Sequence, residues 1–313
     1  MTDLVTFGET MLRLSPPPGT RLSRADELAV HAGGAESNVA AVASNLGLET
    51  AWLSALPASP LGERVVSALR GEGVEPLVAW TDSGRVGTYY FEPGPSPRTP
   101  TVVYDRADTP IREVTPADLP VVRVRDAAAF LTTGITPALS EQAAETARRL
   151  LESAREAGTW TVLDVNYRAK LWGPAAARET LADLFPAVDV LLVAERDARE
   201  VFGHEGDPEA VARAFDGFET VVLTRGQEGA LAVHDGVVHD RPAVPVDTVD
   251  PVGSGDALVG AYLAERLSGG SVPDALAHGV AAAALKRTVA GDVATVSPGE
   301  VEAVLDDETG IDR

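Results

Sequence analysis

The sequence contains no cysteine, which excludes disulfides, thiolate metal sites and cysteine nucleophiles together. It has no apolar run that approaches the roughly 18 residues of a membrane-spanning helix, and no basic and apolar leader precedes the first turn-forming residues. Lysine is nearly missing, because Lys170 and Lys286 are the only two and arginine supplies the remaining fixed positive charge. We therefore expect a soluble cytoplasmic protein.

Negative charge is abundant, with a formal net charge of −21. A surface of this sign repels nucleic acid and anionic membranes, so we expect neither as a partner. Acidic excess with little lysine is typical of proteins from salt-loving archaea, where high ionic strength screens the self-repulsion. An ordinary acidic protein from a GC-rich bacterium is the alternative interpretation. The 45% hydrophobic content over 313 residues is ample for a full core.

Short apolar runs alternate with amphipathic helical stretches along most of the chain. Strands are predicted at Val5–Phe7, Ala51–Leu56, Ala128–Thr132, Thr161–Val165, Val190–Val193 and Thr220–Leu223. Strand–helix alternation predicts an α/β fold in which a mostly parallel sheet has helices on both faces. Two helices, Gly255–Leu267 and Pro273–Val289, close the chain. We expect one domain over residues 1–313.

Two segments, at about residues 12–32 and 81–112, break this rhythm. They contain aromatic and β-branched residues around proline and glycine turns, as in Thr88–Glu92 and Thr101–Asp105. This composition predicts short antiparallel strands. The two segments are expected to pair into a small β-sheet that forms a lid over the larger sheet. Two unrelated surface excursions are the alternative.

The stretch Asp250–Leu258, with the sequence DPVGSGDAL, carries the strongest chemical signal. Its glycines precede an amphipathic helix, so consecutive backbone N–H groups and the helix dipole create an anion site suited to a phosphoryl group. Asp256, in the first helical turn, can accept a proton from an attacking hydroxyl at the same place. A glycine turn with an N-capping aspartate is the alternative interpretation.

Two further stretches have functional patterns. In His31–Ala40, Gly33 and Gly34 permit close backbone approach before a helix of small residues, and Asn38 can both donate and accept hydrogen bonds. A tight packing turn would have the same glycines. In Leu163–Gly173 a strand ends at Asp164, and alternation puts Asp164, Asn166 and Arg168 on one side. Arg168 there can bind a carboxylate or phosphate, or it can form a structural salt bridge.

These stretches together resemble signatures of the PfkB (ribokinase-like) carbohydrate kinases. The run Asp250–Asp256 is similar to the C-terminal DTxGAGD signature of that family, and Gly33–Asn38 is similar to its N-terminal glycine-rich signature. The runs Gly-Gly-Ala-Glu-x-Asn and Asp-x-Asn-x-Arg…Leu-Trp are most like those of 2-keto-3-deoxygluconate kinases. The resemblance covers essentially the whole chain and implies a ribokinase-like fold.

The resemblance also implies roles for individual residues. The implied catalytic group is Gly253, Ser254, Gly255 and Asp256. The implied substrate-binding residues are Gly33, Gly34, Asn38, Tyr89, Tyr104, Arg106, Arg168, Asp256 and Asp292, with Arg106 and Arg168 at the substrate carboxylate. The implied nucleotide-binding residues are Asn166, Tyr167, Arg168, Thr224, Gly226, Gly229, Gly253, Ser254 and Gly255.

One segment departs from the family pattern. Where relatives have Asn-x-x-Glu to organise the metal, this chain has Ala194 and Asp197. Glu195, Asp197 or Glu200 can take over that role through water, so the metal-organising residues stay open. ATP and Mg²⁺ are implied as donor and metal, although ADP-dependent relatives share the fold.

The implied reaction is phosphorylation of the primary hydroxyl of 2-keto-3-deoxygluconate to 2-keto-3-deoxy-6-phosphogluconate, a step of an Entner–Doudoroff-type route. A galactonate-derived substrate fits equally. The alternatives are a fructokinase, a ribokinase or nucleoside kinase, and a non-catalytic protein that binds sugar acids. A dinucleotide oxidoreductase is disfavoured because no Gly-x-Gly-x-x-Gly follows Val5–Phe7. Lids of this fold often pair between subunits, so we expect a homo-oligomer formed through the lid.

Overall fold

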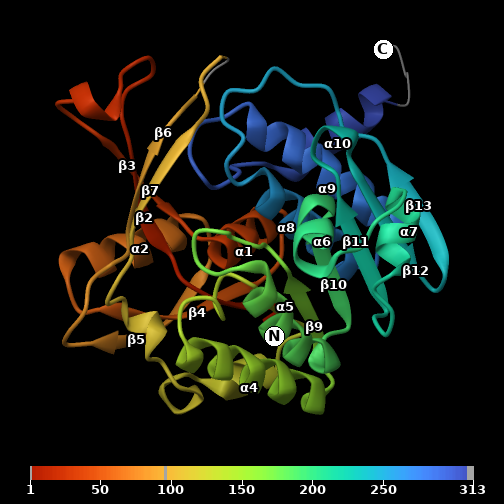
Figure 1. Ribbon diagram of the computed structural model, residues 1–313, viewed down its shortest axis with the longest axis horizontal. Coiled ribbons are helices and arrows are strands. Elements are labelled where there is room, and N and C mark those ends of the chain that lie inside the picture. Colours follow the sequence, from red (N-terminus) through yellow and green to blue (C-terminus); the bar gives the residue numbers. More distant parts are fainter. Residues whose placement is uncertain (1, 95–96, 309–313) are drawn as a thin grey trace.

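The computed structural model describes residues 2–94 and 97–308 and contains two sheets (Figure 1). The larger sheet has nine strands in the order β13-β12-β11-β10-β9-β8-β1-β4-β5. The seven strands from β11 to β5 are parallel, while β12 and β13 run antiparallel at one edge. Along the chain these strands are β1 Leu4–Phe7, β4 Thr50–Pro57, β5 Glu75–Thr81, β8 Ala129–Thr133, β9 Trp160–Asp164, β10 Val190–Ala194, β11 Thr220–Thr224, β12 Ala230–His234 and β13 Val237–Arg241.

Helices cover both faces of this sheet. They are α1 Ala35–Asn45, α2 Pro60–Gly71, α3 Val121–Arg125, α4 Glu141–Ala157, α5 Pro174–Leu184, α6 Glu195–Phe202, α7 Pro208–Arg213, α8 Ser254–Leu267, α9 Val272–Arg287 and α10 Pro298–Glu308. Helices α4 to α7 pack on one face, and α1, α8 and α9 pack on the other. The α/β architecture predicted from the alternating pattern is confirmed.

The central strands of the large sheet have continuous apolar sequences because both of their faces are buried. In β10, Leu191 and Val193 contact the core under α4 to α7, whereas Val190 and Leu192 contact the core under α8 and α9. The same two-residue period separates the two cores at the other central strands. Two layers of helices are therefore needed to cover one sheet.

The smaller sheet, called the small sheet below, has four strands in the order β3-β2-β6-β7. They are β2 Met11–Ser15, β3 Ala29–Gly33, β6 Thr88–Glu92 and β7 Thr101–Asp105. β2 and β6 pair in parallel and the other pairs are antiparallel. The two segments at about residues 12–32 and 81–112 therefore combine into one sheet (Figure 1). Residues 95 and 96 of the second segment lie outside the described residues.

Three details differ from the sequence predictions. Strands β5 and β13, which the sequence analysis did not predict, carry no fully buried residue; β13 lacks an apolar run, whereas β5 contains the run Leu77–Trp80. β9 ends at Asp164, and Asn166 has a φ of 38°, so residues 165–168 are irregular and do not continue the strand. Among residues 2–94 and 97–308, no helix is long and apolar enough to cross a membrane.

Candidate active site

A cavity of about 590 Å³ lies where the carboxyl ends of the parallel strands face the small sheet. Open α/β sheets bind ligands at this end of their strands. Residues that follow or end the large-sheet strands β1, β9, β10 and β11 line the cavity, as do residues of β2, β6 and β7. All sequence-predicted substrate residues line it, namely Gly33, Gly34, Asn38, Tyr89, Tyr104, Arg106, Arg168, Asp256 and Asp292.

The start of α8 provides the anion-binding geometry. Gly253 is the N-cap with φ 82°, a left-handed conformation that favours glycine. A Cβ at this position would overlap the carbonyl oxygen of Asp292, so both conformation and space require glycine. Ser254 and Gly255 open the helix and line the cavity, so the positive end of the helix dipole lies beside it, and the Ser254 N–H also donates to Pro251 O at 3.3 Å.

Asp256 lies one turn into α8 and is held by a residue of another helix. Asn38 of α1 donates from Nδ2 to Asp256 Oδ2 at 2.7 Å. Burial raises the pKa of Asp256 to about 6 against the opposing effects of this hydrogen bond and of Arg168 and Lys286, and the charge of Asp292 raises it further. Asp256 is therefore ionised at neutral pH yet basic enough to accept a proton.

Asp164 and Arg168 lie in the cavity at the end of β9. Burial raises the pKa of Asp164 to about 8, with a further increase from the charge of Asp256, while Arg168 opposes the shift. Arg168 donates to the carbonyl oxygen of Tyr167 at 3.1 Å, and no ion pair is recorded for its side chain among the described residues. Arg168 is therefore available to an anionic ligand.

The second predicted carboxylate-binding arginine is occupied. Arg106, at the end of β7, is buried and forms an ion pair with Glu9, including a 2.9 Å hydrogen bond from Nε. Its guanidinium also lies 5.6 Å from the ring centre of Tyr104. Glu9, which the sequence interpretation did not consider, already neutralises Arg106, and its predicted contact with the substrate carboxylate stays a prediction.

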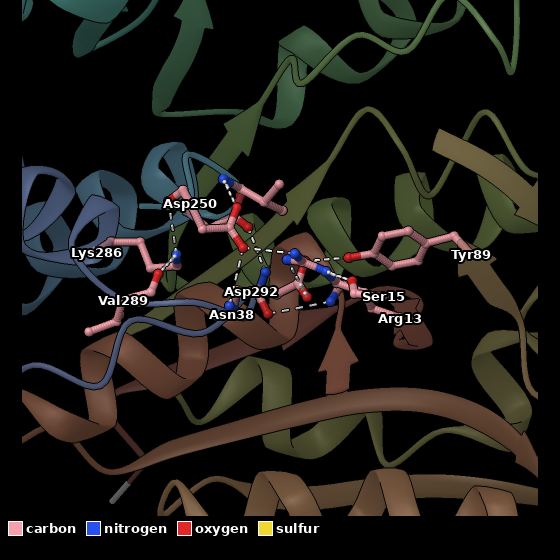
Figure 2. A network of polar contacts seen from close by, with 12 residues as sticks. Arg13, Ser15, Asn38, Tyr89, Asp250, Lys286, Val289 and Asp292 are labelled. Carbon is pink, nitrogen blue, oxygen red and sulfur yellow. Dashed lines mark hydrogen bonds and ion pairs between the residues drawn. The ribbon is translucent and has the colours of Figure 1, made fainter. Parts of the chain in front are cut away.

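Asp292 belongs to a buried network that joins the small sheet to the turn before α8 (Figure 2). The Tyr89 hydroxyl donates to Asp292, and Arg13 of β2 lies 3.4 Å from Asp292 and 2.7 Å from Asp250. Burial raises the pKa of Asp292, and Arg13 lowers it. Tyr89 and Asp292 are therefore oriented before any ligand arrives.

A second cavity of about 330 Å³ meets the first at Thr224, Pro251, Ser254 and Gly255. The predicted nucleotide residues Gly226 and Gly229 line it, and α8 and α9 contribute apolar residues, namely Leu258, Val280, Ala283 and Ala284. Tyr167 lines neither cavity. Its ring packs in the core and its hydroxyl donates to Trp172 O at 3.1 Å, so the predicted contact of this segment with the nucleotide would use its backbone and stays a prediction.

Two of the three acidic candidates for organising a metal, Asp197 and Glu195, differ in position. Asp197 is buried, lines the larger cavity and accepts from the backbone N–H of Tyr167 at 3.2 Å. Glu195 lines neither described cavity and pairs with Arg199 at 2.6 Å, so Asp197 is better placed than Glu195, and the metal assignment stays a prediction. Within the described part of the chain, no group of three or more histidine or acidic residues could hold a metal ion. A divalent ion here would need phosphate and water ligands.

Comparison with known proteins agrees with this geometry. The family model described as pfkB family carbohydrate kinase matches residues 1–298. The chain belongs to the pfkB family of carbohydrate kinases. The sheet order, the separate small sheet and the glycine turn at α8 are thereby those of a kinase fold, as the resemblance implied.

Several pfkB relatives are similar over nearly their whole length. The 2-dehydro-3-deoxygalactonokinase of Haloferax volcanii is 55% identical, covering 99% of each chain. The 2-dehydro-3-deoxygluconokinase of Thermoproteus tenax is 32% identical, covering 97% of this chain and 94% of the relative. The crystal structure of 2-dehydro-3-deoxygluconokinase from Thermotoga maritima has a TM-score of 0.90 and 33% identity, covering 97% and 98% of the two chains.

Sequence reasoning missed several buried charged residues around this kinase site. Glu36 is buried beside the cavity, and its Oε1 accepts from the hydroxyls of Thr133 at 2.8 Å and Thr136 at 2.7 Å. Arg13 and Lys286 were also missed. The signal for Arg13 was a single charge in an otherwise apolar strand, whereas Lys286 stands beside Arg287 in a helix that also contains Asp274 and carried no such signal.

Proposed function

We propose that this pfkB kinase phosphorylates a 2-keto-3-deoxy sugar acid, using ATP as donor and Asp256 as base. The observation that carries this proposal is the arrangement of Arg168, Asp256 and the glycine turn of α8 around one cavity. Arg168 could bind a carboxylate, Asp256 could remove a proton and the glycine turn could bind a phosphoryl group. The names of the relatives from Haloferax and Thermoproteus support the same substrate class.

The acceptor would lie in the larger cavity with its carboxylate at Arg168. An arginine can form two parallel hydrogen bonds with a carboxylate, which supplies both energy and orientation. Arg106 is neutralised by Glu9, so we assign the carboxylate to Arg168 alone. Asn38, Tyr89 and Asp292 provide donors and acceptors for the sugar hydroxyls.

The nucleotide would occupy the smaller cavity, with its base against the apolar residues of α8 and α9 and its phosphates directed to Ser254 and Gly255. Because the two cavities meet at these residues, the terminal phosphoryl group would be next to the acceptor. Mg²⁺ would accompany the donor phosphates and neutralise their charge. Asp197 is the described acidic side chain best placed to contact it through water.

The chemistry then needs one proton acceptor. The primary hydroxyl oxygen of the sugar acid forms a bond to the γ-phosphorus as the bond to the bridging oxygen breaks, leaving ADP. Asp256 takes the hydroxyl proton, and its pKa of about 6 suits this role at neutral pH. The N–H groups at the start of α8 stabilise the charge on the transferring group. Closure of the small sheet as a lid would exclude water.

The gluconate-derived and galactonate-derived acids differ in the configuration of one hydroxyl. The sequence resemblance favours 2-keto-3-deoxygluconate, whereas the 55% identical relative is named for the galactonate-derived acid. We propose that the enzyme accepts both and that the product in each case is the 6-phosphate. Association through the small sheet, and a cytoplasmic location, stay predictions.

The test is a comparison of acceptors in high KCl with ATP and Mg²⁺. We expect both 2-keto-3-deoxy acids to be phosphorylated at least tenfold more efficiently, in kcat/KM, than fructose, ribose or adenosine. Arg168→Met should raise KM for the acids about tenfold or more, the effect of losing a charge-assisted hydrogen bond, and should leave fructose unaffected. Preference for a neutral sugar would overturn the substrate class. Nucleotide binding without turnover of any acceptor would favour a binding protein.

A further inference from the structure

Lys286 is completely buried in the last turn of α9, beside the candidate site but outside its cavities. Its Nζ donates to two backbone carbonyl oxygens, of Val289 at 3.1 Å and of Asp250 at 3.3 Å (Figure 2). Burying an ammonium group costs several kcal/mol unless partners compensate for the lost water. In a chain with only two lysines, this placement calls for a specific role.

The two carbonyls belong to loops that together support the anion-binding turn. The first loop, residues 249–253, leads into α8, and the second, residues 288–292, follows α9. Val249 N donates to Arg287 O at 2.7 Å, and Gly291 N donates to Asp250 Oδ2 at 3.2 Å. Among the described residues, Lys286 is the only cationic side chain that donates hydrogen bonds to backbone carbonyls of both loops.

The Lys286 side chain also reaches the turn itself. A Cβ on Gly253 would lie 3.4 Å from Lys286 Cε and would overlap the carbonyl oxygen of Asp292. Gly253 therefore packs directly against the lysine stem and the second loop. Any shift of these loops would move the N-cap of α8, and with it the N–H groups of the anion site.

The surrounding charges balance. Arg13 lies 2.7 Å from Asp250 and 3.4 Å from Asp292, and Figure 2 shows these aspartates between Arg13 and Lys286. Asp250 and Asp292 favour the charged form of Lys286, although burial lowers its pKa overall. Two cations and two carboxylates thus form a neutral group, in which removal of the Lys286 charge leaves one carboxylate uncompensated.

We propose that Lys286 is a positioning residue for phosphoryl transfer: its ammonium group holds the carbonyl oxygens of Asp250 and Val289 together and thereby fixes the turn Gly253–Gly255. This inference rests on the proposed anion-binding role of that turn. A lysine at a helix C-terminus can also serve simply as a cap for the last carbonyls. A cap alone would contribute to stability and leave the rate of the chemical step unchanged.

The first measurement compares Lys286→Met with wild type and with a matched control. Met keeps the unbranched stem as far as the Cε position and removes the ammonium group. We expect kcat to fall at least tenfold while KM for acceptor and ATP changes less than threefold, because a misplaced anion site loses interactions made only in the transition state. The control is Arg266→Met at the other end of α8, where the guanidinium donates to Gly270 O at 2.7 Å. It should lower Tm and preserve kcat.

The second measurement is chemical rescue of Lys286→Ala at constant ionic strength. Ethylammonium can supply N–H donors and a charge to the two carbonyls, whereas tetramethylammonium supplies charge without a donor. We expect ethylammonium chloride to raise kcat at least fivefold and tetramethylammonium chloride to leave it unchanged. Equal rates in the two salts, or a Lys286→Met kcat within twofold of wild type, would overturn the proposal.

If both variants fail to fold, Lys286→Gln provides the test, because its polar amide is uncharged and its nitrogen ends one atom short of the ammonium position. A kcat at least tenfold below wild type supports the proposal and a wild-type kcat overturns it. All assays use the acceptor that wild type phosphorylates fastest, so an incorrect substrate class does not affect the outcome. Asp256→Asn is measured in parallel: if it stays active, the proposed site itself is wrong, and if it alone is inactive, only the role of Lys286 fails.

Discussion

The hydrogen bond from Asn38 to Asp256 offers a direct test of the base assignment, because it acts on the ionised carboxylate. Asn38 Nδ2 lies 2.7 Å from Asp256 Oδ2 and lowers the pKa of Asp256, which burial otherwise raises to about 6. A hydrogen bond to a charged group contributes about 1.5–3 kcal/mol, and about 1.4 kcal/mol corresponds to one pKa unit. Because water can replace part of the lost interaction, Asn38→Ala should raise this pKa by about 1 unit.

The assay is the pH dependence of kcat/KM, whose acidic limb reports the base of the free enzyme. A base must be deprotonated, so activity rises with pH through its pKa. The wild-type midpoint should lie at about 6. The Asn38→Ala midpoint should lie about one unit higher, which lowers its relative activity at pH 6 about fivefold and leaves pH 8.5 almost unaffected.

Asn45→Ala is the matched control, since Asn45 lies on the same helix and donates to Glu72 Oε2 at 3.2 Å. It removes a similar amide-to-carboxylate bond away from the cavity and should leave the midpoint in place. Asn38 is also a proposed substrate ligand, so the overall level of kcat/KM can fall at every pH. The midpoint is the decisive quantity. A midpoint that stays within 0.3 units of wild type, or moves to lower pH, would refute Asp256 as the titrating base.

Three other perturbations follow from the geometry. Gly253→Ala should cost at least about 1–3 kcal/mol of stability, because φ is 82° there and the added Cβ would also overlap the Asp292 carbonyl oxygen. The kcat should fall at least tenfold. Chemical denaturation and steady-state kinetics check both, and unchanged kcat would argue against the anion site. Glu9→Gln should lower the free energy of unfolding by about 3–5 kcal/mol, since Arg106 stays buried without its partner; a loss below 1 kcal/mol would contradict the assigned pair. Raising KCl from about 0.1 to 1 M shortens the Debye length from about 10 to 3 Å. Because this screens the self-repulsion of a protein with net charge −21, the Tm measured by calorimetry should rise. A constant Tm would remove the argument for salt adaptation.

The sequence by itself determined the architecture to a large extent. Alternating apolar runs and helical stretches identified the six central parallel strands, since a strand buried on both faces needs continuous apolar side chains. The half-exposed edge strands β5 and β13 were not predicted: β13 lacks such a run, and the run Leu77–Trp80 of β5 was left unassigned. The glycine turn at Gly253 was likewise recognisable, because a left-handed N-cap leaves few alternatives to glycine.

Only the tertiary structure decided which charges are free and which are paired. Arg106 and Arg168 look equivalent in the sequence, yet Glu9 neutralises the first and leaves the second open to a ligand. Arg13 and Lys286 enclose Asp250 and Asp292 across sequence separations of up to 279 residues, which no local pattern reveals. The physical reason is that residue type and spacing set backbone preference and burial locally, whereas the state of a buried charge depends on partners that the fold brings together from distant segments.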